Sequence, residues 1–348
     1  MTLTRHAGAA LAAAVVIWAL SAVLGPFRDY QIADIAVYVV AIAGLTVLIG
    51  LSGQISLGHG AFMAVGAYAT ALLQTHLNWP LWALFPVSAL IAAVTGAAVG
   101  VAAARLRGPY LAGATLMLAV AIPSLANQFA SVLGGDQGLG VTVSAPAWLG
   151  ATFPPTRWLA WVNSLVALIV LVLLANLARS RVGRSWRAVR DDEAAAVLAG
   201  LNVARLRVLA FVVSAACAGL AGSMLAVYAS QVSPGSFSVT LSIALLTGAV
   251  IGGLGSLAGA IWGSLVIVLV PTYVQDVATS HGLASAVAAN IPVAAYGVVL
   301  VAVMLTFPDG IQGGLRRLGR LVTPALTTRL NSLRRRPPAS EHQEEGTI

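Results

Sequence analysis

The sequence contains no lysine, because all 19 of its basic residues are arginines. A phosphate-binding loop of the Walker A type needs a lysine to reach the phosphates of a nucleotide. The absence excludes such a site, although residues 51–54 read LSGQ, as in some ATPase signatures. That signature belongs to a soluble nucleotide-binding domain, and none is visible. We therefore interpret the LSGQ match as chance and expect a chain that is not an enzyme and binds no cofactor itself.

Charge is scarce, since only 9% of the residues are charged and 59% are hydrophobic. A soluble domain carries about 25% charged residues. Runs of about 20 apolar residues, the length that crosses a bilayer, recur along the chain. The short alternating segments of an outer-membrane barrel are not visible. The composition predicts an all-α polytopic membrane protein.

Cysteine, histidine and carboxylate side chains are also few. Cys217 is the only cysteine, so no intrachain disulfide can form. His59 is the only histidine placed to lie within a span, so we expect neither a metal site nor the paired catalytic groups of an intramembrane enzyme. No acidic residue is predicted at mid-membrane, where ion-coupled secondary transporters place carboxylates. Such a transporter or a channel is the less favoured alternative.

Ten apolar segments follow one another along the chain. Two or three are short enough to be half-helices or re-entrant pieces, so we expect 8–10 transmembrane helices. We interpret the first as a retained span rather than a signal peptide, because no good cleavage site follows it. The membrane domain is predicted over 1–312, followed by a basic tail, 313–348, that is partly disordered. The segments cover residues 7–25, 31–51, 61–74, 80–104, 111–132, 158–178, 208–229, 239–252, 256–275 and 287–307.

The arginines fix the predicted orientation. Cytoplasmic loops carry an excess of basic residues. With the N-terminus inside, seventeen arginines fall on the inner side, and only Arg28 and Arg157 fall on the outer side. We therefore expect both termini and residues 179–207 to face the cytoplasm.

A glycine-rich polar stretch, GLSGQISLGHGAF (50–62), directly follows an apolar run. Glycine permits tight turns and close backbone approach, and a helix break survives in a membrane only beside protein or a water-filled cavity. We expect a break that lines a transport path. The alternative is a tight turn whose polar side chains bond only to protein. The candidate lining residues are Ser52, Gln54, Ser56, Gly58 and His59.

A second glycine-rich stretch, near residues 249–267, resembles the first and indicates a weak internal repeat. Gly255, Gly259 and Gly263 are spaced four residues apart, and this spacing lets two helix backbones pack closely. We therefore expect these glycines to let two helices pack closely. One candidate location for this packing is the interface between two membrane subunits.

The only long charged segment between two spans covers residues 178–211. An alanine-rich stretch with good helix formers ends at Gly200, which is typical of a helix stop. We expect a short amphipathic helix on the cytoplasmic face. A solvated, positive-inside loop is the simpler alternative.

This segment, RAVRDDEAAAVLAGLNVARLRVLAF, resembles the cytoplasmic coupling loop of ABC importer permeases. Three further stretches, GLSGQISLGHGAFMAVGAYATALL, IGGLGSLAGAIWGSLVI and FPDGIQG, are similar to the branched-chain amino acid permease family, closest to its LivM-type branch. The spacing from Glu-Ala-Ala to glycine is one residue longer than in the general importer pattern, and the Leu-Pro that follows in that pattern is missing. The resemblance implies ATPase contact by the loop over 179–207, with candidates Arg187, Arg190, Asp192, Glu193, Ala195 and Gly200.

The resemblance also implies an assembly and a solute. The partners would be a second permease subunit, which can be a homologous chain or a copy, two ATP-binding subunits that use the ATP, and an extracytoplasmic solute-binding protein. The chain would reside in a bacterial plasma membrane, surrounded by lipid, with no nucleic acid partner. The implied solute is a branched-chain or other hydrophobic amino acid, and urea, amides or another small solute are alternatives.

Overall fold

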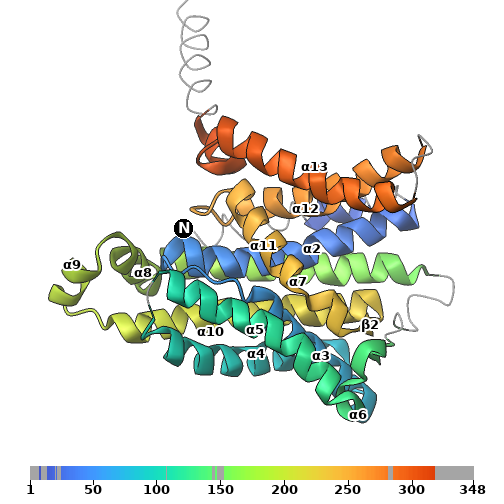
Figure 1. Ribbon diagram of the computed structural model, residues 1–348, viewed down its shortest axis with the longest axis horizontal. Helices are drawn as coiled ribbons and strands as arrows, with labels where there is room; N and C mark the ends of the chain where they lie inside the picture. Colours follow the sequence, from blue (N-terminus) through green and yellow to red (C-terminus); the bar gives the residue numbers. More distant parts are fainter. Residues whose placement is uncertain are drawn as a thin grey trace, which may run out of the picture.

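The computed structural model describes residues 8, 14–19, 21, 25–106, 108–142, 146, 153–280 and 285–317. Within these residues the chain is almost entirely helical (Figure 1). The predicted first span and the tail beyond residue 317 lie largely or wholly outside the described residues. The long helices are α2 (Pro26–Thr46), α3 (His59–Leu77), α4 (Leu81–Ala103), α5 (Pro109–Gln128), α7 (Pro155–Arg179), α10 (Val203–Ala229), α11 (Val239–Gly252), α12 (Gly259–Ser280) and α13 (Ser285–Thr306).

Shorter elements connect these helices. Two strands of two residues each pair antiparallel, Leu139 opposite Val232 and Gly140 opposite Gln231. A further helical stretch over 310–317 follows α13. The short elements are the π-helix η1 (Val47–Leu51), α6 (Ala130–Leu133), η2 (Gly135–Gln137), β1 (Leu139–Gly140), α8 (Arg181–Asp191), α9 (Glu193–Leu198), β2 (Gln231–Val232) and η4 (Pro234–Phe237).

Eight helical stretches in the described part of the chain are long and apolar enough to cross a membrane. This agrees with the predicted all-α polytopic membrane fold of eight to ten spans. The predicted segment 61–74 is the helix α3, which is 19 residues long but is not among the eight. Most of its residues are buried by other helices rather than available to lipid.

Helix α2 forms the centre of the bundle, and α7, α10 and α12 all pack against it (Figure 1). From Val37 to Leu51 nearly every residue of α2 and η1 is buried. Helix α10 also packs on α3 and α4. Proline begins α2, α5 and α7, at a position where its missing N–H costs no helical hydrogen bond. Because the buried residues from Val37 to Leu51 cover all sides of the helix, other helices surround this part of α2, as expected for a helix that is apolar all round.

Glycines bring several helix pairs into backbone contact. A Cβ at Gly66 on α3 would lie 2.0 Å from the carbonyl oxygen of Gly219 on α10. A Cβ at Gly263 on α12 would lie 2.1 Å from the carbonyl oxygen of Gly248 on α11. The predicted close packing is therefore confirmed at Gly259 and Gly263, which pack against α11 of the same chain. It is wrong for Gly255, where a Cβ would meet no atom within 4 Å.

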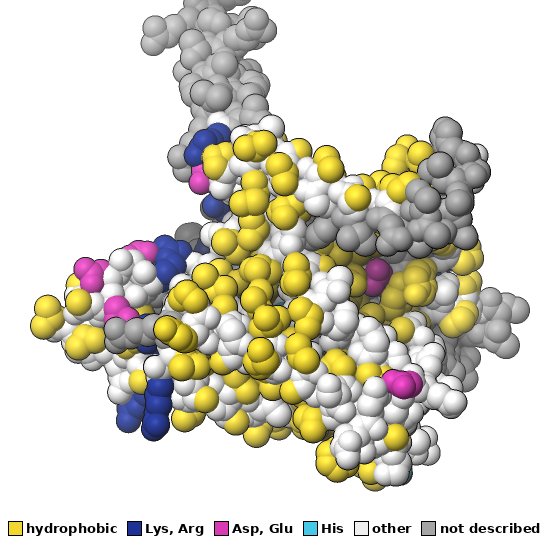
Figure 2. Space-filling view, in the orientation of Figure 1, with side chains coloured by type: hydrophobic (Ala, Val, Ile, Leu, Met, Phe, Trp, Pro, Cys, Tyr) yellow, Lys and Arg dark blue, Asp and Glu magenta, His cyan; other side chains and the backbone are white. Residues whose placement is uncertain are grey.

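The bundle has two chemically different ends. Figure 2 shows hydrophobic side chains over the flanks of the visible face, with arginines gathered where α8, α9 and the end of α13 lie. The opposite end carries the β1–β2 pair and an ion pair of 3.3 Å between Arg157 Nε and the fully buried Asp29. The predicted separation of the arginines is therefore present in the fold. Arg28 and Arg157 lie at the starts of α2 and α7, at one end of the bundle (Figure 1). The other end has the arginines at or beyond the ends of α4, α7 and α13, in α8 and at the start of α10, namely Arg105, Arg179, Arg181, Arg184, Arg187, Arg190, Arg205, Arg207, Arg316 and Arg317.

Candidate functional site

The predicted helix break lies where α2 ends. Helix α2 passes into the π-helix η1, residues 52–58 are not helical, and α3 starts at His59. We call residues 52–58 the first break. Gly53 has a φ of +73°, a left-handed conformation that favours glycine. A Cβ at Gly58 would lie 2.5 Å from the carbonyl oxygen of Thr115 on α5. The glycines therefore serve a turn and a close approach, as the sequence predicts.

All five predicted lining residues are buried or nearly so. Ser52, Gln54, Ser56 and His59 are each 5% exposed or less. The Ser52 hydroxyl donates to the Leu48 carbonyl at 2.7 Å, and Gln54 Nε2 donates to Ser52 Oγ at 2.9 Å. These contacts hold the break against its own helix.

Neighbouring helices fix the rest of the break. The hydroxyl of Thr115 on α5 accepts a hydrogen bond from the Leu57 amide at 2.9 Å. The hydroxyl of Ser242 on α11 accepts one from the Gly60 amide at 3.0 Å. His59 Nε2 lies 2.9 Å from the Ala41 carbonyl oxygen of α2. Protein thus covers Ser52, Gln54, Ser56 and Gly58, whereas Gly53 and Ile55 are exposed. The protein contacts satisfy part of the irregular backbone, as a break at membrane depth requires.

Two polar atoms at the break have no protein partner within the described residues. They are Gln54 Oε1 and His59 Nδ1, and both are buried. Buried polar atoms in native proteins are nearly always hydrogen-bonded, and water or a ligand supplies the bond where protein does not. Both atoms therefore have an unused hydrogen-bonding capacity within the described residues.

A second break, residues 253–258, separates α11 from α12 and touches η1 directly before the first break. A Cβ on Gly50 would lie 1.7 Å from the carbonyl oxygen of Leu254. A Cβ on Gly253 would lie 2.8 Å from the carbonyl oxygen of Asp309, in the FPDG stretch that the sequence singles out. The two glycine-rich stretches of the weak internal repeat therefore meet at the arginine-rich end of the bundle.

The charged segment forms two helices rather than the single helix that the sequence predicts. Helix α8 stops at Asp191, and Asp192 begins α9 by accepting a hydrogen bond from the Ala195 amide at 3.0 Å. An aspartate with extended backbone is a strong N-cap, and this local preference divides the helix. The prediction of a helix ending at Gly200 is confirmed, because Gly200 has a φ of +81° and Leu201 N donates to the Ala196 carbonyl at 3.0 Å.

Helix α9 buries one side and exposes the other. Ala196 packs with Val189 and Val203 in a small hydrophobic cluster. On the opposite side, Val197 is 55% exposed and Leu198 is 90% exposed. Ala195 is exposed as well, and a Cβ at Gly200 would meet no atom within 4 Å. The tip of α9 is therefore an open apolar surface.

The charged segment and the first break are bonded to each other. Arg190 Nη1 on α8 donates to the carbonyl oxygen of Gly50 at the end of η1. Glu193 on α9 forms an ion pair of 2.8 Å with Arg207 on α10. The backbone carbonyl of Arg207 in turn accepts a hydrogen bond from Gln54 Nε2 at 3.3 Å. Two sets of candidates predicted separately are therefore one connected unit.

The remaining candidate, Arg187, points away from the tip of α9. Its Nη1 donates to the carbonyl oxygen of Ala178 at the end of α7, at 3.0 Å. The sequence reasoning missed Thr115, Ser242 and Arg207, which hold the break in place. Thr115 and Ser242 are two of several small polar residues in otherwise apolar helices, so no local pattern distinguishes them.

The comparisons with known proteins agree with this architecture. Residues 28–308 match the family described as branched-chain amino acid transport system, permease component. LivM, a high-affinity branched-chain amino acid transport permease of Escherichia coli K12, is 34% identical over 263 residues, which cover 69% of this chain and 62% of LivM. LivH of Salmonella typhimurium is 24% identical over 293 residues, covering 79% of this chain and 91% of LivH. No solved structure matches the chain significantly.

The chain belongs to the branched-chain amino acid transport permease family. The predicted family and its LivM-type branch are therefore confirmed. Membership of a permease family also agrees with the prediction of a multi-pass membrane transport subunit that is not the ATPase. The match spans less than two thirds of the length of the LivM relatives.

Proposed function

We propose that this chain is the membrane-spanning permease subunit of an ABC importer, and that separate subunits hydrolyse the ATP. The carrying observation is that the charged segment offers an exposed apolar tip and is bonded directly to the helix break. The family supports the transport role, because its description names a permease component. The solute is a branched-chain or other hydrophobic amino acid, as the names of LivM and LivH support. Urea, amides or another small solute are the alternatives within the same machinery.

The tip of α9 is the docking surface for the ATPase. Val197 and Leu198 present apolar side chains to solvent, where a single isolated domain gains nothing from them. A short helix that enters a hydrophobic groove of a partner is a common recognition mode. One such loop from each of two permeases would engage two ATP-binding subunits. A solute-binding protein would dock at the opposite end, beside β1 and β2.

Movement of the docked tip would reach the break through two contacts. Displacing α8 pulls on the Gly50 carbonyl through Arg190, and displacing α9 acts on Arg207 through Glu193. The first contact ends on the Gly50 carbonyl. The second ends on the guanidinium group of Arg207, whose own backbone carbonyl accepts a hydrogen bond from Gln54. The coupling role of the segment over 179–207 is therefore argued from rigid connections rather than from its charge alone.

The arginine-rich end is the cytoplasmic end in this proposal, because basic residues accumulate on the cytoplasmic side. The plasma membrane of a bacterium is the corresponding location, with both termini inside. A hydrolysing partner must reach α9 from the cytoplasm, where ATP is present. Charge distribution and docking requirement thus favour the same orientation.

The first break lies beside the translocation path. A zwitterionic amino acid carries a carboxylate and an ammonium group, and both need polar partners when water is stripped away. Gln54 Oε1 accepts from an ammonium group or water, and His59 Nδ1 offers a second polar contact. Ser52 and Ser56 position this surface, and Gly58 keeps it pressed against α5.

Substitution of the α9 tip tests the proposal. We expect Leu198→Asp, produced together with the partner subunits, to lose the ATPase during purification and to lower leucine uptake at least about tenfold, equivalent to 1.4 kcal/mol. Leu315→Asp is the matched control, because Leu315 is an exposed leucine at the same end but outside α9. Retention of the ATPase and normal uptake in Leu198→Asp would rule out α9 as the docking surface.

A second variant tests transmission. Arg190→Ala should keep the ATPase bound and its hydrolysis active while uptake falls, because the link to Gly50 is lost. Arg181→Ala removes an exposed arginine from the same helix and serves as control. Equal uptake per ATP hydrolysed in both variants would show that Arg190 transmits nothing.

A further inference from the structure

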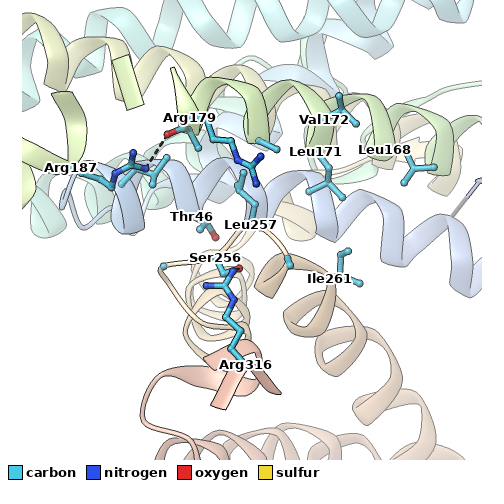
Figure 3. A pocket seen from close by; sticks show the side chains of 15 residues that line it. Thr46, Leu168, Leu171, Val172, Arg179, Arg187, Ser256, Leu257, Ile261 and Arg316 are labelled. Atoms are coloured by element: carbon cyan, nitrogen blue, oxygen red, sulfur yellow. Dashed lines mark hydrogen bonds between the residues drawn. The ribbon is translucent and has the colours of Figure 1, made fainter. Parts of the chain in front are cut away.

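A pocket of about 520 Å³ lies at the arginine-rich end, between α7 and α12 (Figure 3). Both helices pack on α2, and the C-terminal part of α2 and η1 provides Thr46 and Leu51 as pocket wall. Residues 255–258 of the second break close the side of the pocket next to α12. We call this the arginine pocket, because Arg179, Arg187 and Arg316 line it from three separate elements.

The three guanidinium groups come from the end of α7, from α8 and from the helical stretch over 310–317. Figure 3 shows Arg179 directed from α7 toward Leu257, and Arg316 reaching from the other side toward Ser256. Arg316 Nη2 donates to Ser256 Oγ at 2.9 Å, and Arg187 donates to the Ala178 carbonyl. These bonds hold two of the three groups at the pocket while leaving most of their five N–H donors unused.

No carboxylate forms an ion pair with these three arginines in the part of the chain that the structure describes, although Asp309, the partner of Arg317, lines a neighbouring pocket together with Arg316. Arg190, Arg207 and Arg317, at the same end, each pair with an acidic residue of this chain. Arg179 and Arg316 pair with no acidic residue among those that the structure describes. Neither does Arg187 form an ion pair among these residues. Three positive groups without a counter-charge repel one another, and an anion between them would stabilise the arrangement.

The rest of the wall is hydrocarbon. Leu168, Leu171 and Val172 of α7 and Ile261 of α12 line the pocket away from the arginines. The Thr46 hydroxyl is already bonded to the Ile42 carbonyl. A hydrated amino acid would find few polar partners along such a wall. An apolar wall that ends in basic groups at a membrane surface instead matches a phospholipid.

The apolar wall also continues onto the outside of the bundle. Leu165, Ile169 and Leu173 on α7 are 56%, 50% and 61% exposed, as expected for side chains that face lipid. An acyl chain can therefore pass from the bilayer into the pocket without crossing a polar surface. We propose that the arginine pocket binds an anionic phospholipid of the cytoplasmic leaflet, with its phosphate between Arg179, Arg187 and Arg316 and an acyl chain along α7.

The identity of the leaflet rests on the orientation given under Proposed function, but binding itself does not. The test uses the full chain, purified with its partner subunits and placed in bilayer discs of phosphatidylcholine with or without phosphatidylglycerol. We compare the wild type with Arg179→Gln/Arg316→Gln. Arg181→Gln/Arg205→Gln is the matched control, because it removes two exposed arginines of the same end that lie outside the pocket.

We expect phosphatidylglycerol to raise the apparent melting midpoint of the wild type and the control pair by several degrees, but not that of the pocket pair. Mass spectrometry of the intact complex should show phosphatidylglycerol retained in the first two only. An equal shift in all three proteins would overturn the proposal. Loss of the partner subunits from the pocket pair would also overturn it, because a partner's acidic group would then be the anion.

Two further arms separate a lipid from a free anion. Inorganic phosphate alone should give no shift, and an equal shift with phosphate would refute the lipid assignment. Leu171→Trp fills the apolar part of the pocket and leaves all three arginines in place. This variant should lose the retained lipid, whereas unchanged retention would show that no acyl chain enters the pocket.

Discussion

Replacement of Gly50 by alanine tests the contact between η1 and the second break. The added Cβ would lie 1.7 Å from the Leu254 carbonyl oxygen and 2.8 Å from its carbonyl carbon. Even the close carbon–oxygen contacts of weak hydrogen bonds are about 3.3 Å, so the two backbones would have to separate by about 1.6 Å. The atoms that the Cβ would meet at Leu254 belong to the backbone, so no flexible side chain can move aside. The cost should reach the upper part of the usual range for overpacking, about 3 kcal/mol.

Gly255→Ala is the matched control, because a Cβ there meets nothing within 4 Å although Gly255 belongs to the second break. The assay is the apparent melting midpoint of the assembled transporter in detergent. At about 2 °C per kcal/mol for a chain of this size, Gly50→Ala should melt about 6 °C below the wild type. Gly255→Ala should melt within 1 °C of it, on the order of measurement error. Equal midpoints for both variants would refute the contact.

Three further predictions follow from the packing. Gln54→Leu should assemble normally but slow uptake about tenfold, and unchanged uptake would leave the break as a structural turn. Arg157→Met should lower the free energy of unfolding by about 3–5 kcal/mol, because Asp29 is then buried without its ion-pair partner. Adding Asp29→Asn should restore most of this stability, and a double variant without recovery would contradict the cause. With Cys217 replaced by alanine, a membrane-impermeant thiol reagent applied to intact cells should label the Asp136→Cys variant but not the Arg181→Cys variant. Labelling of Arg181→Cys alone would show that the orientation is inverted.

Much of the candidate site is visible in the sequence because it depends on local chemistry. Glycine and small polar residues after an apolar run predict the break near Gly50, since only such residues turn sharply inside a membrane. An alanine-rich helix ending at Gly200 is likewise a local signal. The division of that helix at Asp192 was missed, although an aspartate ahead of an alanine run is a capping signal. Whether the helix divides there also depends on the hydrogen bond from Arg190 to Gly50, which is far away in the sequence.

The sequence by itself determined the class of protein, because scarce charge and repeated apolar runs permit only membrane helices. It also determined the separation of arginines between the two ends, because the spacing of the spans assigns each loop to a side. Only the tertiary structure decided that Gly50 touches Leu254 and that Arg190 reaches the break, since these contacts join residues far apart in the chain. The same holds for the arginine pocket. Its three basic groups come from α7, α8 and residue 316, and only the packing of those elements brings their charges together.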